Sequence, residues 1–365
     1  MTNATLLLFP PPLAGGRLTT KQKLEPSALR AALDAEVSHY QAHALAESST
    51  KNASTALRAY AVFCWLTDDY PNPKEGISDA QLARYVAFLA RTHAHSTIEQ
   101  YITMGPRLYQ RQTLGLDWKV PSERFPVHTT LTGVKRIKGS GPTRRKLPFT
   151  LEMLAAMAPH MAIGSNQQDT CLWAAWLTMF FGMLRKGNTT AVDGAKATPP
   201  CVIQRSDVLI EAAPSGPSVR ITVRHTKTIQ FGQRALTFYL PRRDNAPPHM
   251  CPTKVLIAHL MDTREVTTGP LFAWRQPEGT GHRVGPVPYQ VMLARLKTAM
   301  VAAGLPAEHF ASHSFRRGGA TYAFLLGMPD HMIMILGDWK SPVWRDYAEV
   351  QLELRRRGAE LFSQC

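Results

Sequence analysis

The sequence predicts a mainly α-helical protein of the α+β class, with two domains and one small antiparallel sheet. Apolar residues recur with a helical period of 3.6 over most of the chain. The period changes to 2 between residues 207 and 240, as in strands with one buried face. The chain has 365 residues, of which 44% are hydrophobic. That content suffices for two cores of ordinary domain size.

The N-terminal part is expected to be an extension followed by a helical bundle. Residues 1–48 combine a proline-rich start with a modest helical pattern, and we assign them to the extension. Residues 49–130 carry apolar stripes over 53–66 and 79–91 and a third helical pattern, and the bundle should end near Gly115. Ser96 is the expected N-cap of the third helix, with Glu99 as its capping-box partner.

Residues 150–365 are expected to form a second, mostly helical domain around the sheet. Three short strands over 207–211, 219–223 and 236–240 would form this three-stranded antiparallel sheet. Helices are expected over 150–157, 169–184, 251–261, 289–303, 313–326, 329–336 and 342 to about 356, with Gly304, Gly327 and Gly337 as helix stops.

The chain is strongly basic, and the charge is unevenly distributed. Lys and Arg number 42 against 27 Asp and Glu, a surplus of 15. Residues 1–130 hold 13 basic and 11 acidic side chains, which leaves 29 and 16 for the rest. A surplus of this size indicates a polyanionic partner. Composition alone leaves DNA, RNA and an anionic membrane open.

A basic segment, residues 131–149, separates the two predicted domains and contains no acidic residue. Its glycines and proline predict a flexible linker. The linker is either a solvated tether or a strap laid across a phosphate backbone, where each neutralised phosphate adds sequence-independent affinity. Its basic residues are Lys135, Arg136, Lys138, Arg144, Arg145 and Lys146.

Cysteine spacing and hydropathy argue against several classes of protein. The five cysteines lie far apart, without a C-x-x-C pair, so neither a disulfide scaffold nor a zinc site is expected. The protein is expected to reside in a reducing compartment. The longest apolar stretch, Cys171–Leu184, suits a buried helix better than a membrane span. The N-terminal prolines and the lack of a basic start argue against a secretory signal, whereas the absence of acidic residues before Glu25 leaves a transit peptide open.

The segments most informative about chemistry lie in the second half of the chain. His313 and Arg316 are three residues apart on one helix face, so they can address one anion together. Tyr347 follows after one intervening helix. Upstream, Arg185 ends the long apolar helix, and Lys227 stands at a turn after a strand, where it can reach a substrate.

In this order, Arg, Lys, His-x-x-Arg and Tyr resemble the tyrosine recombinases, or phage-type integrases, from about Ser49 onward. The amino-acid sequences of four segments resemble most closely those of the recombinases of eukaryotic DIRS-like and Crypton mobile elements. These segments are Lys227-Thr-Ile-Gln-Phe-Gly-Gln-Arg, Gly269-Pro-Leu-Phe, His313-Ser-Phe-Arg-Arg-Gly-Gly-Ala-Thr and Leu336-Gly-Asp-Trp-Lys-Ser. The resemblance implies a SAM-like DNA-binding bundle over residues 49–130 and a catalytic domain over 150–365.

The resemblance also implies a reaction, DNA strand cleavage and rejoining through a 3′-phosphotyrosyl intermediate. Tyr347 would be the nucleophile. His313 would assist its deprotonation or orient the phosphate. Arg185 and Arg316 would clamp the non-bridging oxygens, and Lys227 would protonate the leaving 5′ oxygen. No cofactor or metal ion is expected.

One position departs from the pattern familiar in phage and bacterial members. Nine residues before the tyrosine they usually carry a His or Trp donor, whereas this chain has Asp338 followed by Trp339. An ionised carboxylate cannot donate to phosphate. Either Trp339 contacts the phosphate through its indole N–H, or Asp338 orients a neighbour such as His313 or an arginine.

The resemblance extends to partners and compartment. Double-stranded DNA would be bound by a tetramer on two synapsed sites, through a Holliday junction, and no membrane is involved. The compartment would be the nucleus in a eukaryote and otherwise the cytoplasm or nucleoid. Residues 348–365 would pack in cis or, preferably, dock on a neighbouring protomer. Further DNA-backbone contacts are expected from Lys186, Arg317 and Lys340.

Three rival functions remain open. A type IB topoisomerase-like nicking and closing enzyme would use the same chemistry without synapsis. A domesticated, non-catalytic protein would keep only DNA binding. A metal-dependent nuclease would need clustered carboxylates, which the sequence lacks. Gly318 and Gly319 each cost a helix about 1 kcal/mol relative to alanine, so close packing against another helix or against DNA is expected there.

Overall fold

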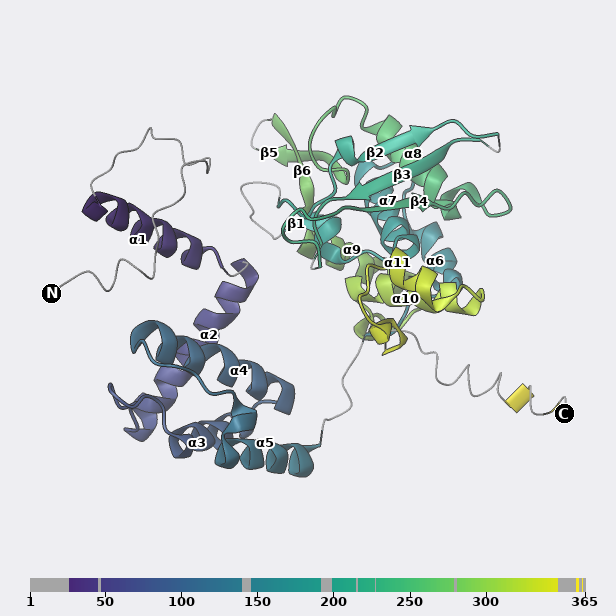
Figure 1. Cartoon of the computed structure of the whole chain (residues 1–365). Helices are drawn as coiled ribbons and strands as arrows, with labels where there is room; N and C mark the ends of the chain where they lie inside the picture. The colour runs from purple at the N-terminus through teal and green to yellow at the C-terminus, as the bar shows by residue number, and fades with distance from the viewer. Residues whose placement is uncertain are drawn as a thin grey trace. The chain divides into compact units, whose positions relative to one another are not determined.

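The computed structural model describes residues 26–44, 47–139, 146–191, 199–214, 216–226, 228–278, 281–346, 359–360 and 363. The chain divides into two compact units, Met1–Thr143 and Arg144–Cys365. The mostly helical chain with small three-stranded sheets confirms the predicted fold class (Figure 1). Several predicted residues lie outside the described ones: Arg144, Arg145, Lys227, Tyr347 and most of the C-terminal tail.

The first unit is built from helices α1 (Pro26–Ala42), α2 (Glu47–Thr67), α3 (Asp79–Ala90), α4 (His95–Leu108) and α5 (Phe125–Lys138). Its core is aromatic at the centre, where the Tyr60 and Tyr85 rings meet edge to face with centroids 5.1 Å apart. Helices α2 and α4 approach closely at Gly105, where a Cβ would lie 2.5 Å from the carbonyl oxygen of Ala56. Glycine is therefore required at this crossing.

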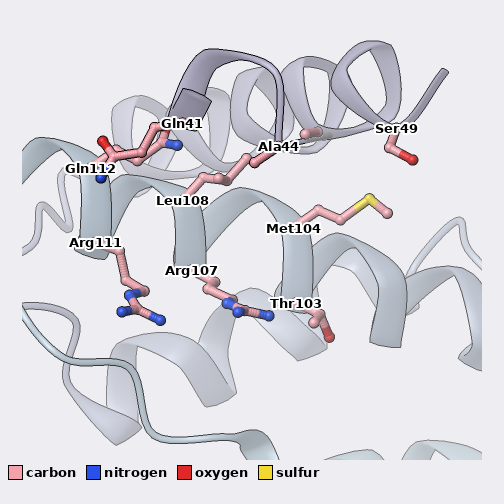
Figure 2. Close-up of a pocket in the computed structure, with 10 residues that line it drawn as sticks. Gln41, Ala44, Ser49, Thr103, Met104, Arg107, Leu108, Arg111 and Gln112 are labelled. Atoms are coloured by element: carbon pink, nitrogen blue, oxygen red, sulfur yellow. The ribbon is translucent and has the colours of Figure 1, made fainter. Parts of the chain in front are cut away.

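A groove of about 1040 Å³ in the first unit runs between the start of α2 and α4. In Figure 2, Leu108 points from α4 toward Ala44 and Met104 points toward Ser49, while Arg107 and Arg111 extend from the other side of the helix. The groove contains none of the residues that the sequence marked as candidates for chemistry.

Three sequence-based predictions in this unit were wrong. Helix α4 begins at His95 with Ala94 as its N-cap, two residues before the predicted cap Ser96, and this cap makes no side-chain hydrogen bond. The bundle does not end near Gly115, because α5 adds Val127 and Leu131 to the first core. The predicted start of the flexible linker at residue 131 was also too early, because α5 continues through Lys138. An apolar residue every three to four positions in α5 outweighs the local basic charge.

The second unit is organised around α7 (Gln167–Phe181), which is buried along nearly its whole length. Asn166 caps it by accepting a hydrogen bond from the Asp169 amide at 3.0 Å. The remaining helices are α6 (Leu151–Met157), capped by Thr150, α8 (Pro252–Asp262), α9 (Tyr289–Ala302), α10 (Ser312–Leu325) and α11 (Asp330–Leu336), followed by a 3₁₀ segment, Pro342–Asp346. The expected continuation of that last helix lies beyond the described residues.

The predicted sheet is present, and a second one accompanies it. Strands β2 (Val208–Glu211), β3 (Ser218–Val223) and β4 (Leu236–Leu240) form an antiparallel sheet in the order β2-β3-β4. Alternate residues such as Ile221 and Phe238 pair across it and face the core. A second sheet of β1 (Thr190–Ala191), β6 (Gly281–Pro288) and β5 (Ala273–Glu278) was not predicted, because these segments lack an alternating pattern.

Close packing between α10 and α7 explains the paired glycines. A Cβ on Gly319 would lie 2.0 Å from the carbonyl oxygen of Phe180, and one on Gly318 would lie 2.3 Å from the carbonyl oxygen of Phe149. Of the two explanations that the sequence left open, packing against another helix therefore accounts for Gly319, and packing against the segment before α6 accounts for Gly318. Both contacts fix the depth at which α10 lies on the core.

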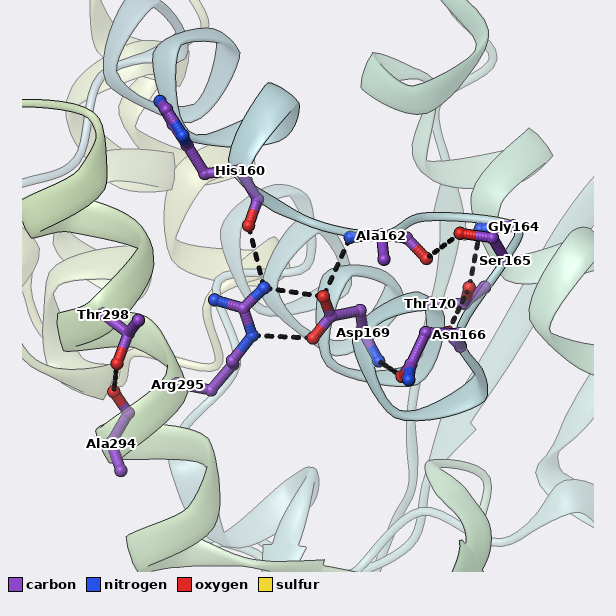
Figure 3. A network of polar contacts seen from close by, with 10 residues as sticks. All are labelled: His160, Ala162, Gly164, Ser165, Asn166, Asp169, Thr170, Ala294, Arg295 and Thr298. Carbon is purple, nitrogen blue, oxygen red and sulfur yellow. Dashed lines mark hydrogen bonds and ion pairs between the residues drawn. The ribbon is translucent and has the colours of Figure 1, made fainter.

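A buried polar clamp ties α9 to the start of α7 (Figure 3). The Arg295 guanidinium donates to both carboxylate oxygens of Asp169, at 2.7 and 2.6 Å, and to the carbonyl oxygen of His160 at 2.8 Å. The Ala162 amide donates to the same carboxylate at 2.8 Å. Burial alone would raise the pKa of Asp169, but these hydrogen bonds outweigh it and lower the pKa below its usual value. The start of α7 is thus fixed to α9 by charge as well as by packing.

Among the described residues, the structure has no helix that is long and apolar enough to cross a membrane.

Candidate functional site

Arg316 is the centre of the candidate site. It lies on α10, is 2% exposed, and donates hydrogen bonds to the carbonyl oxygens of Met183 and, at 2.6 Å, Gly337. Its guanidinium carbon lies 3.9 Å from the centre of the Trp339 ring, within the range of a cation–π contact. One side chain therefore joins α10 to the segments that follow α7 and α11.

Arg185 is carried to this junction by the chain that leaves α7. Gly182 ends the helix, and Met183 adopts a left-handed conformation (φ 48°) that turns the chain. Leu184 is buried, and Arg185, half-buried, precedes the 3₁₀ turn Lys186–Asn188. Arg316 donates a hydrogen bond to the carbonyl oxygen of Met183, two residues before Arg185. This bond ties the segment that carries Arg185 to Arg316.

His313 lies one helical turn before Arg316 on α10 and is exposed. Its pKa is lowered to about 4, first because surrounding atoms remove part of its hydration and then because of the positive charges of Arg316, Arg317 and Arg185. A histidine in this environment is neutral at pH 7. The three arginine charges also mark the site as a place where an anion would be stabilised.

Asp338 is buried and accepts hydrogen bonds from three side chains. The hydroxyls of Thr226, at 2.6 Å, and Thr228 donate to one carboxylate oxygen, and the Arg234 guanidinium donates to the other. Burial alone would raise the pKa of Asp338, but these donors lower it below its usual value. The carboxylate is thus ionised and faces the turn after β3, in which Lys227 stands between the two threonines.

Trp339 and Trp344 are both packed in a small core beneath α10 and α11. Trp339, 7% exposed, stacks on Arg316, and Trp344, 1% exposed, packs against Phe324. The burial of Trp344, three residues before Tyr347 in the sequence, holds the 3₁₀ segment Pro342–Asp346 against this core. Trp339 therefore contacts Arg316 directly, and Trp344 belongs to the same small core.

The basic residues expected to contact DNA fall in different environments. In the first unit, the residues at the end of α5, Lys135, Arg136 and Lys138, are all exposed. In the second unit, Lys340 is exposed, Lys186 lies 3.6 Å above the Tyr289 ring, and Lys146 donates to the carbonyl oxygen of Glu308 at 2.7 Å. Arg317, also expected to contact the DNA backbone, is only 5% exposed.

Sequence reasoning missed the partners of Asp338. Thr226, Thr228 and Arg234 were not singled out, although two threonines flank Lys227 in the sequence. Arg234 and Asp338 also line a groove of about 520 Å³ beside α11, together with His331, Ile335 and Lys340. Within the described part of the chain, no group of three or more His, Cys, Asp or Glu side chains is placed to hold a metal ion.

Comparison with known proteins identifies solved structures with a similar fold. No protein-family model and no curated protein matches the sequence. Among solved structures, the chain is similar to the site-specific recombinase XerH bound to a palindromic difH substrate, with a TM-score of 0.53 and 14% identity over 79% of this chain and 73% of that one. It is also similar to a lambda integrase (75–356) dimer bound to a COC′ core site, with a TM-score of 0.50 and 14% identity over 88% and 95%.

These similarities show a recombinase and integrase fold. At this level of identity they bear on the fold alone. They confirm the expected architecture, and they leave the eukaryotic mobile-element subgroup as a prediction.

Proposed function

We propose that this protein cleaves and rejoins DNA strands through a covalent phosphotyrosyl intermediate. The observation that carries the proposal is the junction made by Arg316, which bonds the segments leading to Arg185 and to Asp338 while His313 lies one turn away. Residues separated by up to 153 positions are thereby gathered around one strongly positive point. DNA supplies the complementary group, a backbone phosphate.

In the proposed reaction, the Tyr347 oxygen attacks the phosphorus and the bond from phosphorus to the 5′ oxygen breaks. Arg185 and Arg316 stabilise the charge that builds on the non-bridging oxygens. Lys227 donates a proton to the leaving 5′ oxygen. Religation reverses these steps, because the phosphotyrosyl bond conserves the energy of the bond that was broken.

His313 is suited to accept or share the tyrosine proton. In the DNA-free protein it is neutral at pH 7, because its pKa is lowered to about 4. A bound phosphate would offset the arginine charges and raise that pKa. The histidine would then be a stronger base when the substrate is in place.

The arrangement of Asp338 and Trp339 supports distinct roles for the two residues. Asp338 is already engaged by three donors, and its ionised carboxylate would repel a phosphate. Trp339 supports Arg316 by stacking. We therefore assign neither residue to the chemical step itself, and the two arginines and the lysine supply the positive charge.

Trapping on a nicked suicide DNA substrate in EDTA tests the proposed reaction. The parent protein should form a covalent adduct with DNA, and Tyr347→Phe should form none. An undiminished adduct in Tyr347→Phe would refute the assignment of the nucleophile, and DNA cleavage without an adduct that EDTA abolishes would indicate a metal-dependent nuclease. Absence of both adduct and cleavage by the parent protein, with DNA binding retained, would favour a non-catalytic DNA-binding protein.

Synapsis is a further part of the proposal. By its sequence likeness to mobile-element recombinases, the protein would act as a tetramer on two DNA sites, in the nucleus of a eukaryotic host. Joining of two separate DNA sites should then accompany adduct formation. Relaxation of supercoils without joining would indicate a topoisomerase-like enzyme instead.

The basic end of α5 provides a separate test of DNA contact. Replacing Lys135, Arg136 and Lys138 with glutamine should weaken binding to unrelated DNA sequences alike. The slope of log affinity against log salt should fall by roughly 2.7, since each phosphate contact contributes about 0.9. Fluorescence anisotropy titrations at several salt concentrations measure this slope, and an unchanged slope would show that these three residues do not touch DNA.

A further inference from the structure

The carboxylate of Asp338 connects two elements that are far apart in the sequence. One oxygen accepts from Thr226 at 2.6 Å and from Thr228, and the other accepts from Arg234. Asp338 is 6% exposed and adopts a left-handed conformation (φ 52°) directly after α11. The unusual backbone conformation of a buried, fully bonded aspartate indicates that this contact is specifically built.

The turn that Asp338 holds is well defined by its own hydrogen bonds. The Thr226 amide donates to the carbonyl oxygen of Ile229 at 3.1 Å, and the Ile229 amide donates back at 3.2 Å. Ile229 is fully buried in the core of the second unit. The turn is therefore closed by backbone bonds at its base, and its two threonine side chains bond the carboxylate from another element.

The neighbour of Asp338 faces the arginine site. The Gly337 carbonyl accepts a hydrogen bond from Arg316 at 2.6 Å. Two consecutive residues thus bond Arg316 on one side and the turn after β3 on the other. Any displacement of this dipeptide would move the turn relative to Arg316.

We infer that Asp338 is a positioning residue that sets the Lys227-bearing turn against Arg316, so that the lysine can protonate the leaving 5′ oxygen; this inference rests on the proposed function. A carboxylate suits the task because it accepts several hydrogen bonds at once, from two hydroxyls and a guanidinium. Tryptophan, with a single N–H donor and no acceptor, could not make these bonds. This gives the aspartate a function at a position where phage and bacterial relatives of the resembled family carry a donor.

A substrate that needs no leaving-group protonation tests the inference. In DNA with sulfur in place of the bridging 5′ oxygen, the leaving group is a thiolate. Because a thiol has a pKa near 8.5, it departs without a proton from the lysine. Cleavage rates on this DNA and on ordinary DNA are compared for the parent protein, Asp338→Ala, Lys227→Ala and a matched control, Thr222→Val. Thr222 lies on β3, and its hydroxyl pairs with that of Thr237 across the sheet at 3.4 Å.

Asp338→Ala should cleave ordinary DNA roughly 10- to 100-fold more slowly, as expected for a misplaced catalytic group. On the sulfur-containing DNA its rate should approach that of the parent, as for Lys227→Ala, while Thr222→Val should match the parent on both. Equal slowing on both substrates would overturn the inference, because Asp338 would then serve the site as a whole. A parent-like rate on ordinary DNA would overturn it as well.

Two further measurements keep the test decisive if Asp338→Ala folds poorly or the parent shows no cleavage. Replacing both Thr226 and Thr228 with serine keeps the donors and should preserve the rate, whereas replacing both with valine should reproduce the substrate-dependent defect. Hydrogen exchange of the Ile229 amide should accelerate in Asp338→Asn. Unchanged exchange would refute the anchoring, whereas absence of cleavage by the parent would refute the proposed function alone.

Discussion

Adding a methyl group at Gly319 should displace the helix that carries the candidate site. Gly319 lies on α10, two turns after His313 and one turn after Arg316. In Gly319→Ala the new Cβ would lie 2.0 Å from the Phe180 carbonyl oxygen and 3.2 Å from the Met183 side chain. Because the nearest atom belongs to the main chain of α7, it cannot rotate away, and α10 must move.

The expected size of the effect follows from two opposing terms. Alanine in place of glycine inside a helix gains about 1 kcal/mol. Overpacking costs roughly 1–3 kcal/mol, and the upper end applies here because a backbone atom is in the way. The net loss in the free energy of unfolding of the second unit is therefore about 2 kcal/mol. For a unit of this size, Tm should fall by about 4–8 °C.

Differential scanning calorimetry measures this change, with Gly133→Ala as the matched control. Gly133 lies within α5 of the first unit, and a Cβ there would meet nothing within 4 Å. This control should stabilise the first unit by about 1 kcal/mol. If Gly319→Ala were instead to stabilise the second unit as Gly133→Ala does the first, the packing of α10 on α7 would be refuted.

Two more predictions concern charged groups. Since a bound phosphate should raise the lowered pKa of His313, DNA binding takes up a proton, so affinity should increase as the pH falls from about 6.5 toward 4. Anisotropy titrations should show this dependence flattened in His313→Gln but retained in His309→Gln, and a parent protein without it would exclude phosphate contact at His313. Arg295→Met leaves the buried Asp169 carboxylate without its guanidinium partner and should cost about 2–4 kcal/mol of stability at pH 7. Because the pKa of Asp169 is lowered, calorimetry should show this loss shrinking as the pH drops below about 4, and a loss independent of pH would contradict the pairing.

Periodicity in the sequence was sufficient to locate most elements of the fold. The helix at Leu151–Met157 and the three strands ending at Leu240 were predicted correctly. The basic end of α5 was predicted as linker, because a run of like charges is typical of an exposed, flexible segment. The burial of Leu131 in the first core shows that this end belongs to the helix. The second sheet was missed since its strand β1 has two residues and pairs in parallel with a distant segment.

The sequence by itself determined which residue types are available for phosphate chemistry and their order along the chain, because order and local period are properties of neighbouring residues. It left the role of Asp338 open between orienting His313 and orienting an arginine that it could not specify. Only the tertiary structure decided that the aspartate accepts from Thr226, Thr228 and Arg234, more than 100 residues earlier. It likewise decided that Gly319 faces α7. These contacts depend on how α7, α10 and α11 pack, and packing between distant segments leaves no periodic trace in a single sequence.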